Sequence, residues 1–486
     1  MTQPANGKHV ALGPVGSLLL SVAVVLTACE QEPFPNAAMP PPPNPEVLLV
    51  DYNESDIALG EMLTKVIARA KAAPDSGEAR GELGMTYEMN DFQEAAIATY
   101  AQAWALEPGE FLWPYFQSQL MYKLGDTDEA VRVLDAALKL DDQYVPAWLW
   151  RGSWLRALGR FDEAIEAFER AEELGAGAPA IAGIAQALMG KQQHEEALEL
   201  LQGLSHINHP HIQRLLGRAY QAVGMTDDAR IALARGRDAT PMQWRDERHQ
   251  PKWQFLASHG GRLVHAEGLL NSGQFEEAVA VLEPMFEATP EDPAVVSNLA
   301  MAHGRVGNTE RAFELIEHGL GVDPEYYRYY NVLASIHYHR EELETALGHL
   351  DAAIAAYPAQ AWAHQQMARI FMQQRRYDEA VAAFDRALQY GPETPEQLLH
   401  QAGIIEGARE RWDEAIERFQ RAVAIDESFT LAYIYLGRSL AEAGRFEEAT
   451  TALDWAERLA THPQELSGAR ARANALEKAA NWTYEG

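Results

Sequence analysis

A short motif recurs along most of this chain at a nearly constant interval. Each full copy has an acidic pair, an alanine, and an aromatic residue or leucine four positions after the alanine. Successive marker alanines are 34, 34, 33, 32, 49, 34, 34, 34, 35 and 34 residues apart. Such a period predicts repeated units that stack along one direction. The markers are Ala96, Ala130, Ala164, Ala197, Ala229, Ala278, Ala312, Ala346, Ala380, Ala415 and Ala449.

Other positions keep the same register, and each has a physical reason. A small residue stands twelve positions before the marker, as Gly152 and Gly403 do, where it lets two helices approach closely. A proline often stands twelve positions after it, as Pro290 and Pro324 do, where it ends a helix. The acidic pair fits the first turn of a helix, where the helix dipole favours negative charge. Each unit is therefore expected to be two helices joined by a turn.

A 34-residue unit with these positions resembles the tetratricopeptide repeat. The resemblance covers roughly residues 78–463 and implies an all-α fold, a right-handed superhelical solenoid of about eleven helix-turn-helix hairpins with capping helices at its ends. Stacking supplies the core, because no single hairpin buries both of its faces. The expected organisation is an N-terminal capping region (46–76), repeats 1–5 (77–241), an insertion loop (242–258), repeats 6–11 (259–463), and a C-terminal capping helix and tail (464–486).

The N-terminus has the pattern of a secretory signal. Lys8 precedes an apolar run from Val10 to Val25, which is shorter than the roughly 20 residues of a membrane span. The sequence Leu26–Cys29 resembles a bacterial lipobox, in which the cysteine becomes the lipidated first residue. Residues 1–28 are thus predicted to be a lipoprotein signal peptide and Cys29, the only cysteine, the lipidation site; an ordinary signal with an incidental cysteine is the alternative.

Residues 29–45 are rich in proline, which favours extended polyproline II over a packed core. They are predicted to form a tether that holds the body away from its anchor. By the same resemblance, Glu30 after the cysteine favours the outer membrane, facing the periplasm. The formal charge of −31 argues against nucleic acid as a partner, since so acidic a body repels phosphate backbones.

In the resembled family the first helix of each hairpin lines the concave groove. Projecting its inward positions onto this chain gives more arginines than carboxylates, with aromatic and amide companions, which fits an extended acidic segment of a protein or glycan. An alternative is that some arginines lie on the rim, balanced by acidic helices. The central candidates are Arg214, Arg218, Arg305, Arg328, Asn331, Tyr338, Trp362, Gln365 and Arg369, and the same projection includes Glu88, Tyr115, Tyr122, Lys123, Arg156, Glu267 and Glu442.

The insertion is a second candidate binding region, because loops that interrupt a regular solenoid often bind partners. Its notable residues are Trp244, Arg245 and Trp253. The competing interpretation is that the two tryptophans fill the joint between the halves of the array. His206, His209 and His211 are of a type that binds metal ions, but no cysteine or nearby carboxylate completes the set, which favours a solvated loop.

No catalytic motif stands out, and no cofactor or metal is expected. The sequence predicts a non-enzymatic, membrane-anchored scaffold that binds a protein partner in the bacterial envelope. A scaffold for polysaccharide export, or for secretion or pilus assembly, is the alternative, and an enzyme with its site in the insertion is a weaker one. The sequence leaves the oligomeric state open.

Overall fold

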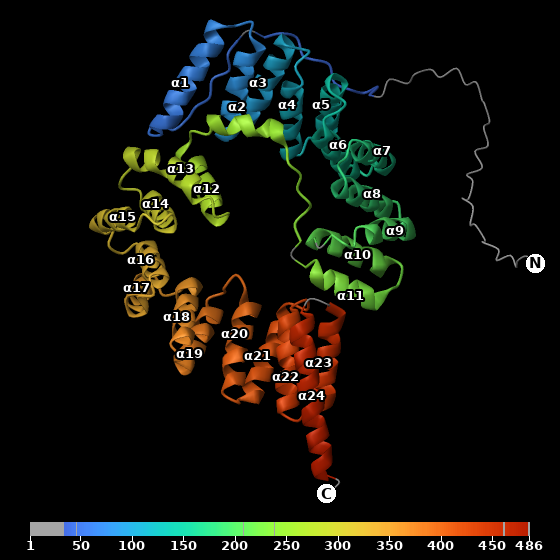
Figure 1. The fold of residues 1–486 in the computed structure, drawn as a ribbon. Helices are drawn as coiled ribbons and strands as arrows, with labels where there is room; N and C mark the ends of the chain where they lie inside the picture. Colours follow the sequence, from blue (N-terminus) through green and yellow to red (C-terminus); the bar gives the residue numbers. More distant parts are fainter. Residues whose placement is uncertain (1–33, 45, 208, 238, 460–461, 485–486) are drawn as a thin grey trace, which may run out of the picture.

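The computed structural model describes residues 34–44, 46–207, 209–237, 239–459 and 462–484. Within these residues every regular element is a helix, as the sequence predicts (Figure 1). The predicted signal peptide and Cys29 lie outside the described residues. No helix among the described residues has the length and hydropathy needed to cross a membrane.

After a capping helix, five hairpins form what we call the first arc. Each hairpin pairs an even-numbered first helix with an odd-numbered second helix, and the acidic pairs lie in the first turns of second helices as expected. The cap is α1 (Ile57–Ala72), and the hairpins are α2 (Gly77–Met89), α3 (Gln93–Leu106), α4 (Leu112–Lys123), α5 (Thr127–Leu140), α6 (Val145–Ala157), α7 (Phe161–Glu173), α8 (Ala178–Gly190), α9 (His194–Gly203), α10 (Pro210–Ala222) and α11 (Thr226–Arg235).

Six more hairpins form the second arc, which follows an insertion containing the 3-10 helix η1 (Glu247–Phe255). The hairpin total in the described residues is therefore eleven, and a last helix covers the end. The helices are α12 (His259–Asn271), α13 (Phe275–Ala288), α14 (Pro293–Arg305), α15 (Thr309–Val322), α16 (Tyr327–His339), α17 (Leu343–Ala356), α18 (Ala361–Gln373), α19 (Tyr377–Gln389), α20 (Pro395–Ala408), α21 (Trp412–Ile425), α22 (Thr430–Glu442), α23 (Phe446–Leu459) and α24 (Pro463–Tyr484).

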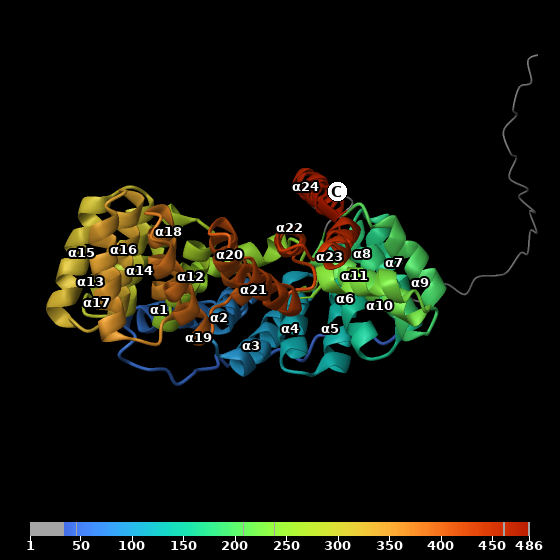
Figure 2. The ribbon, with the colours of Figure 1, turned by 90° about the horizontal axis from the view of Figure 1, so that it is seen from below.

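The two arcs together close into a ring (Figure 1), which Figure 2 shows from below. The second arc starts beside α1 and ends against α11. There the Arg230 guanidinium lies 3.0 Å from a carboxylate oxygen of Glu427 and 4.5 Å above the ring of Trp455. Arg235 donates to the backbone carbonyl of Arg458 at 3.1 Å. The closing contact thus includes polar pairs, and Ile231 of α11 also packs against the apolar cluster of the last hairpins.

The proline-rich segment differs from the expected tether where it is described. Phe34 is only 4% exposed and packs against the ring of Trp148, at 5.6 Å between centroids. The backbone N–H of Ala38 donates to the carbonyl of Arg132 at 2.8 Å. An extended chain has no internal hydrogen bonds, so its backbone groups are free to pair with the neighbouring helices. The prediction that this stretch stands away from the body is therefore wrong for residues 34–38, whereas Met39 is 83% exposed.

The small residues of the repeat bring the two helices of a hairpin together. A Cβ placed on Gly403 would lie 2.8 Å from the ring of Phe419, which is 1% exposed, and Gly152 has the same relation to Phe168. Contacts this short leave no room for even one methyl group.

We therefore expect Gly403→Ala to destabilise the chain by about 1–3 kcal/mol through overpacking. Gly348→Ala is the matched control, because no atom lies within 4 Å of its added Cβ in the interior of α17. That variant should be neutral or more stable by about 0.5–1 kcal/mol. Urea unfolding followed by circular dichroism measures both, and equal effects of the two substitutions would contradict the close-approach interpretation.

Candidate functional site

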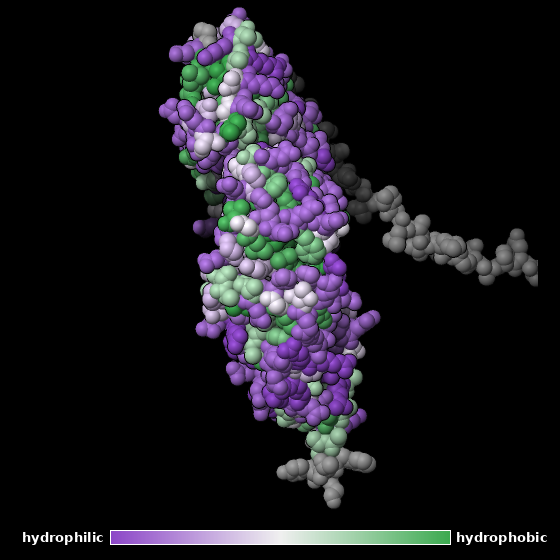
Figure 3. Space-filling view, turned by 90° about the vertical axis from the view of Figure 1, so that its left-hand side faces the viewer, coloured by the Kyte–Doolittle hydropathy of each residue, from purple (hydrophilic) through white to green (hydrophobic). Residues whose placement is uncertain are grey.

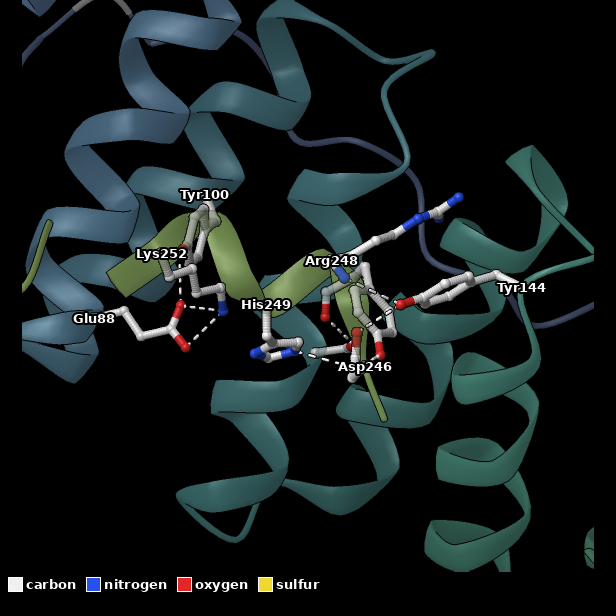
Figure 4. A network of polar contacts seen from close by, with 9 residues as sticks. Glu88, Tyr100, Tyr144, Asp246, Arg248, His249 and Lys252 are labelled. Atoms are coloured by element: carbon white, nitrogen blue, oxygen red, sulfur yellow. Dashed lines mark hydrogen bonds and ion pairs between the residues drawn. The ribbon is translucent and has the colours of Figure 1, made fainter. Parts of the chain in front are cut away.

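The insertion turns back along the concave side of the first arc. Its 3-10 helix crosses the first helices α2 and α4, as the close-up in Figure 4 shows. Several residues that the projection placed in the groove, among them Glu88 and Tyr115, therefore bind the insertion. The insertion of the same chain thus occupies this part of the groove of the first arc.

A buried ion pair holds the middle of the insertion (Figure 4). The Lys252 ammonium lies 2.7 and 2.6 Å from the two carboxylate oxygens of Glu88. Its side chain is only 2% exposed, and its nitrogen is 3.7 Å from the ring centroid of Phe116. Burial lowers the pKa of Lys252, and the Glu88 carboxylate opposes this shift. The Tyr100 hydroxyl completes the cluster by donating to Glu88 at 2.6 Å.

A second polar cluster holds the start of the 3-10 helix. The Asp246 carboxylate accepts hydrogen bonds from the hydroxyls of Tyr115 and, at 2.6 Å, Tyr144. Burial first, and then the Asp246 charge, raise the pKa of Tyr115 well above its usual value, so this phenol stays a donor. The Arg248 guanidinium lies 3.9 Å above the ring of Tyr144 and is paired with Asp141 at 2.5 Å.

The end of the insertion sets where the second arc begins. The Asn90 side chain donates to the carbonyl of Phe255 at 2.8 Å and accepts from the N–H groups of Ala257 and Ser258 at 2.9 and 2.6 Å. The next N–H, of His259, donates to the Asp56 carboxylate at 2.8 Å. These bonds fix the first residue of α12 beside α1 and α2.

The three candidates in the insertion have different surroundings. Trp244 packs edge-on against Trp150, with ring centroids 4.7 Å apart. Arg245 is 73% exposed and lies 3.5 Å from Glu247. Trp253 is 52% exposed and stacks on His265 of α12 at 4.5 Å. Trp244 and Trp253 thus contribute to packing between parts of the chain, whereas Arg245 lies at the surface beside Glu247.

The inner surface of the second arc is open, unlike that of the first. The first helices α14, α16 and α18 lie nearer the centre of the ring than their partners α15, α17 and α19 (Figure 1). On each of these first helices, side chains three or four residues apart are partly or fully exposed. Residues at this spacing lie on one face of a helix. We call this set the inner stripe, and it consists of Asn298, Met301, Arg305, Arg328, Asn331, Ser335, Tyr338, Trp362, Gln365, Arg369 and Gln373.

The inner stripe contains three arginines and no carboxylate. Arg328 has the one nearby acid, Glu267 of α12, at 3.7 Å. Arg305, at the end of α14, lies 4.8 Å from the ring centroid of Phe275 and borders a small pocket of about 60 Å³ at the helix end. Arg369 and Trp362 are exposed, and the Asn331 amide donates to Gln360 at 3.0 Å. Seven of the nine central groove candidates therefore share one face of the second arc.

The other two groove candidates, Arg214 and Arg218, lie on α10 of the first arc beyond the end of the insertion. Arg214 approaches a ring nitrogen of His211 at 3.4 Å, and Arg218 is exposed. His211 is buried at 6% exposure, whereas His206 is exposed. The described part of the chain holds no group of three histidine, cysteine or acidic side chains arranged to bind a metal.

The outer face of the second arc contrasts with the inner stripe. Seen from the left of Figure 1, it is mostly hydrophilic, with hydrophobic residues in several separate areas (Figure 3). Many of its arginines are paired along one helix, as Arg376 is with Glu379 at 2.9 Å and Arg311 with Glu314 at 3.2 Å. On the inner stripe, by contrast, Arg305 and Arg369 form no ion pair with a described residue.

We expect Lys252→Met to destabilise the protein by about 3–5 kcal/mol, since Glu88 would keep its charge in a desolvated site without its cation. The double variant Glu88→Gln, Lys252→Met should recover most of this loss, because it removes both charges and keeps an acceptor for Tyr100. The control Lys191→Met breaks an exposed pair with Asp162 and should cost under about 1 kcal/mol. Chemical denaturation measures all three, and a silent Lys252→Met would show that the insertion does not depend on this pair.

Comparison with known proteins bears on the repeat. Models described as tetratricopeptide repeat match residues 117–179 and 297–361, 359–428, and 155–213. A Drosophila melanogaster homolog of the BBSome complex member BBS4 is 21% identical over 361 residues, which span 73% of this chain and 66% of that protein. This chain therefore matches just under two thirds of that relative's length.

Solved structures with similarity include yeast Tom70, at 15% identity and a TM-score of 0.36 over 83% of this chain and 96% of that one. Pseudomonas aeruginosa pilF has 16% identity and a TM-score of 0.37 over 44% and 96%. The matched repeats and the eleven stacked hairpins support the tetratricopeptide repeat family, and the chain is an all-helical superhelical solenoid of that type.

Proposed function

We propose that this chain is a non-catalytic scaffold, anchored in the bacterial cell envelope, that binds an acidic segment of a partner protein on the inner stripe of the second arc. The observation that carries the proposal is the composition of the stripe, with Arg305, Arg328 and Arg369 and no carboxylate on a chain of charge −31. The tetratricopeptide repeat matches support a protein-binding role of this coarse kind.

The stripe has the groups that an extended acidic chain requires. Arginine presents a planar set of donors that matches a carboxylate with two parallel hydrogen bonds. The amides of Gln365 and Gln373 can donate to and accept from a partner's backbone. Trp362, which is 39% exposed, offers an apolar area of the kind that anchors many interfaces. An extended segment that alternates acidic and apolar side chains would use all three.

The anchor is inferred from the N-terminus alone. Residues 1–28 have the pattern of a lipoprotein signal, and Cys29 is the residue that would carry the acyl chains. Two or more acyl chains hold a protein stably at a membrane, whereas one holds it only marginally. We propose the outer membrane, facing the periplasm, as the site of anchoring. A scaffold for polysaccharide export, secretion or pilus assembly would have the same anchor and a different partner.

Replacing Cys29 by serine tests the anchor. In a bacterial host that processes lipoproteins, the native chain should incorporate an alkyne-labelled fatty acid and sediment with membranes. Cys29→Ser should lose the label and move to the soluble periplasmic fraction, because no sulfur remains to be acylated. Retention of the serine variant in the membrane pellet would argue against lipidation as the anchor.

A charge reversal tests the stripe. We expect Arg328→Glu, Arg369→Glu to abolish capture of the partner when the lipidated protein is pulled down from detergent-solubilised envelopes. Adding Arg305→Glu should not restore it. The control is Arg386→Glu, Arg421→Glu, which changes the net charge equally on the exposed second helices α19 and α21.

The native protein, the Arg328→Glu, Arg369→Glu variant and the control variant should have the same circular dichroism spectrum and the same unfolding midpoint within error. A partner that is lost only from the inner-stripe variant supports the proposal. If the native protein and both double variants capture the partner equally, the binding surface lies elsewhere on the ring. The inner-stripe assignment would then be abandoned.

A further inference from the structure

A second site is present where the insertion meets the first arc. A pocket of about 510 Å³ lies between α6, α8 and α10 on one side and residues 241–244 on the other. This volume is within the range of about 300–1,000 Å³ that small-ligand sites occupy. We call it the tryptophan pocket, and the residues that define its chemistry are Tyr122, Trp150, Arg156, Gln186, His211 and Trp244.

Arg156 is the charged group of the tryptophan pocket. No carboxylate lines the pocket, and in the described part of the chain none lies within ion-pair distance of this guanidinium. Burial lowers the pKa of Arg156, with only the Tyr122 hydroxyl opposing the shift. A half-buried guanidinium without a counterion is costly unless a ligand supplies one.

The surroundings of Arg156 add to the positive potential. His211 bridges Gln186 and Arg214 through its ring nitrogens, at 3.2 and 3.4 Å. Burial first, and then the charges of Arg214 and other neighbours including Arg156, lower the pKa of His211 to about 4, so that its imidazole is neutral near pH 7. The charge presented by this side of the pocket therefore comes from arginine.

Aromatic rings form part of the remaining lining, together with apolar residues such as Pro179 and Met242 and the polar Gln243. Trp150 and Trp244 stand edge to face, and Tyr122 stacks on Trp154 at 4.9 Å. The indole N–H groups of Trp150 and Trp244 are buried and have no acceptor among the described residues. The pocket thus combines aromatic walls with one guanidinium that has no carboxylate partner among the described residues.

We propose that the tryptophan pocket binds a carboxylate attached to an apolar or aromatic group. The carboxylate pairs with the Arg156 guanidinium, and the apolar group packs against the parts of Trp150 and Trp244 that line the pocket. Two sources have this chemistry, a free aromatic acid and the C-terminal residue of a protein chain. The site goes beyond the proposed function because it lies in the first arc, is formed partly by the insertion, and uses no residue of the inner stripe.

Binding of simple probes tests the proposal with the full chain. Phenylacetate and the peptide acetyl-Ala-Phe with a free carboxyl end represent the two sources. Phenethylamine and the same peptide with an amidated end are the matched probes without a carboxylate. Affinity is measured by isothermal titration calorimetry. Contact is located by ¹⁹F NMR of protein labelled with 5-fluorotryptophan, with signals assigned by Trp150→Phe and Trp244→Phe.

We expect at least one of the two acids to bind and to shift the ¹⁹F signals of Trp150 and Trp244, while the amine and the amide do not. Arg156→Gln should weaken that binding about tenfold or more, the scale of one lost charge-assisted hydrogen bond. Arg245→Gln, which removes an exposed arginine next to Trp244 but outside the pocket, should leave it unchanged. If the peptide acid binds and phenylacetate does not, the ligand class is the C-terminus of a protein chain. If phenylacetate binds and the peptide acid does not, the ligand class is a free acid.

Failure of both acids at millimolar concentration would overturn the proposal. So would an affinity unaffected by Arg156→Gln in a variant whose circular dichroism is native, or equal binding of the amine. The double reversal of Arg328 and Arg369 should leave probe binding unchanged, so failure of this site and failure of the inner stripe are distinguishable.

Discussion

The ion pair between Lys252 and Glu88 joins residues 164 positions apart and lies where the two arcs meet. Moving both charges out of water costs several kcal/mol each, and their attraction offsets that cost only with good geometry and further hydrogen bonds. Here the ammonium contacts both oxygens of Glu88, which also accepts from Tyr100. Such a pair adds little net stability compared with an apolar substitute. It does disfavour any other register of the insertion against the first arc, because a shifted insertion would leave both charges buried and unpaired.

The closed ring depends on this register of the insertion along the first arc. Asn90 and Asp56 bind the residues just before and at the start of α12, so the second arc begins at one defined place beside the cap of the first. Six hairpins of nearly constant geometry then carry the chain around to α11. The contact there includes arginines such as Arg230 and Arg235, and Ile231 packs against the apolar cluster of the last hairpins. The place of closure therefore depends on where the second arc starts and on its length.

The sequence predicted the elements well because they repeat. The period of 34 placed eleven helical pairs, and the small residue of each unit, such as Gly403, indicated close approach that the contact with Phe419 confirms. The same periodicity put Arg328 and Arg369 on one line of first-helix positions. Neither the path of the insertion nor the ring was predictable in this way, since residues 242–258 occur once and have no repeat to set their register.

One signal for that path was present in the sequence. The projected groove of the first arc contains Glu88 and two tyrosines, and the insertion contains Lys252, Asp246 and Arg248, a complementary set. Charge matching alone does not choose among the many acidic and basic residues of this chain, so the pairing required the structure. The tryptophan pocket was less accessible still, because Trp150 occupies a helix position at which an aromatic ring is ordinarily part of the core, and its partner Trp244 comes from the insertion.

The net charge constrains how either proposed site would meet an acidic ligand. At physiological ionic strength the potential of exposed charges decays over about 8 Å, so the −31 of the chain acts weakly on a ligand until the two are close. At contact the nearest groups decide, and on the inner stripe and in the tryptophan pocket these are guanidinium groups. An acidic ligand would therefore be repelled only close to the acidic parts of the surface and attracted at these two places, which suppresses binding to the outer surface. For a chain this acidic, selective binding of an acidic ligand requires surfaces on which arginines such as Arg305 and Arg369 are not matched by carboxylates.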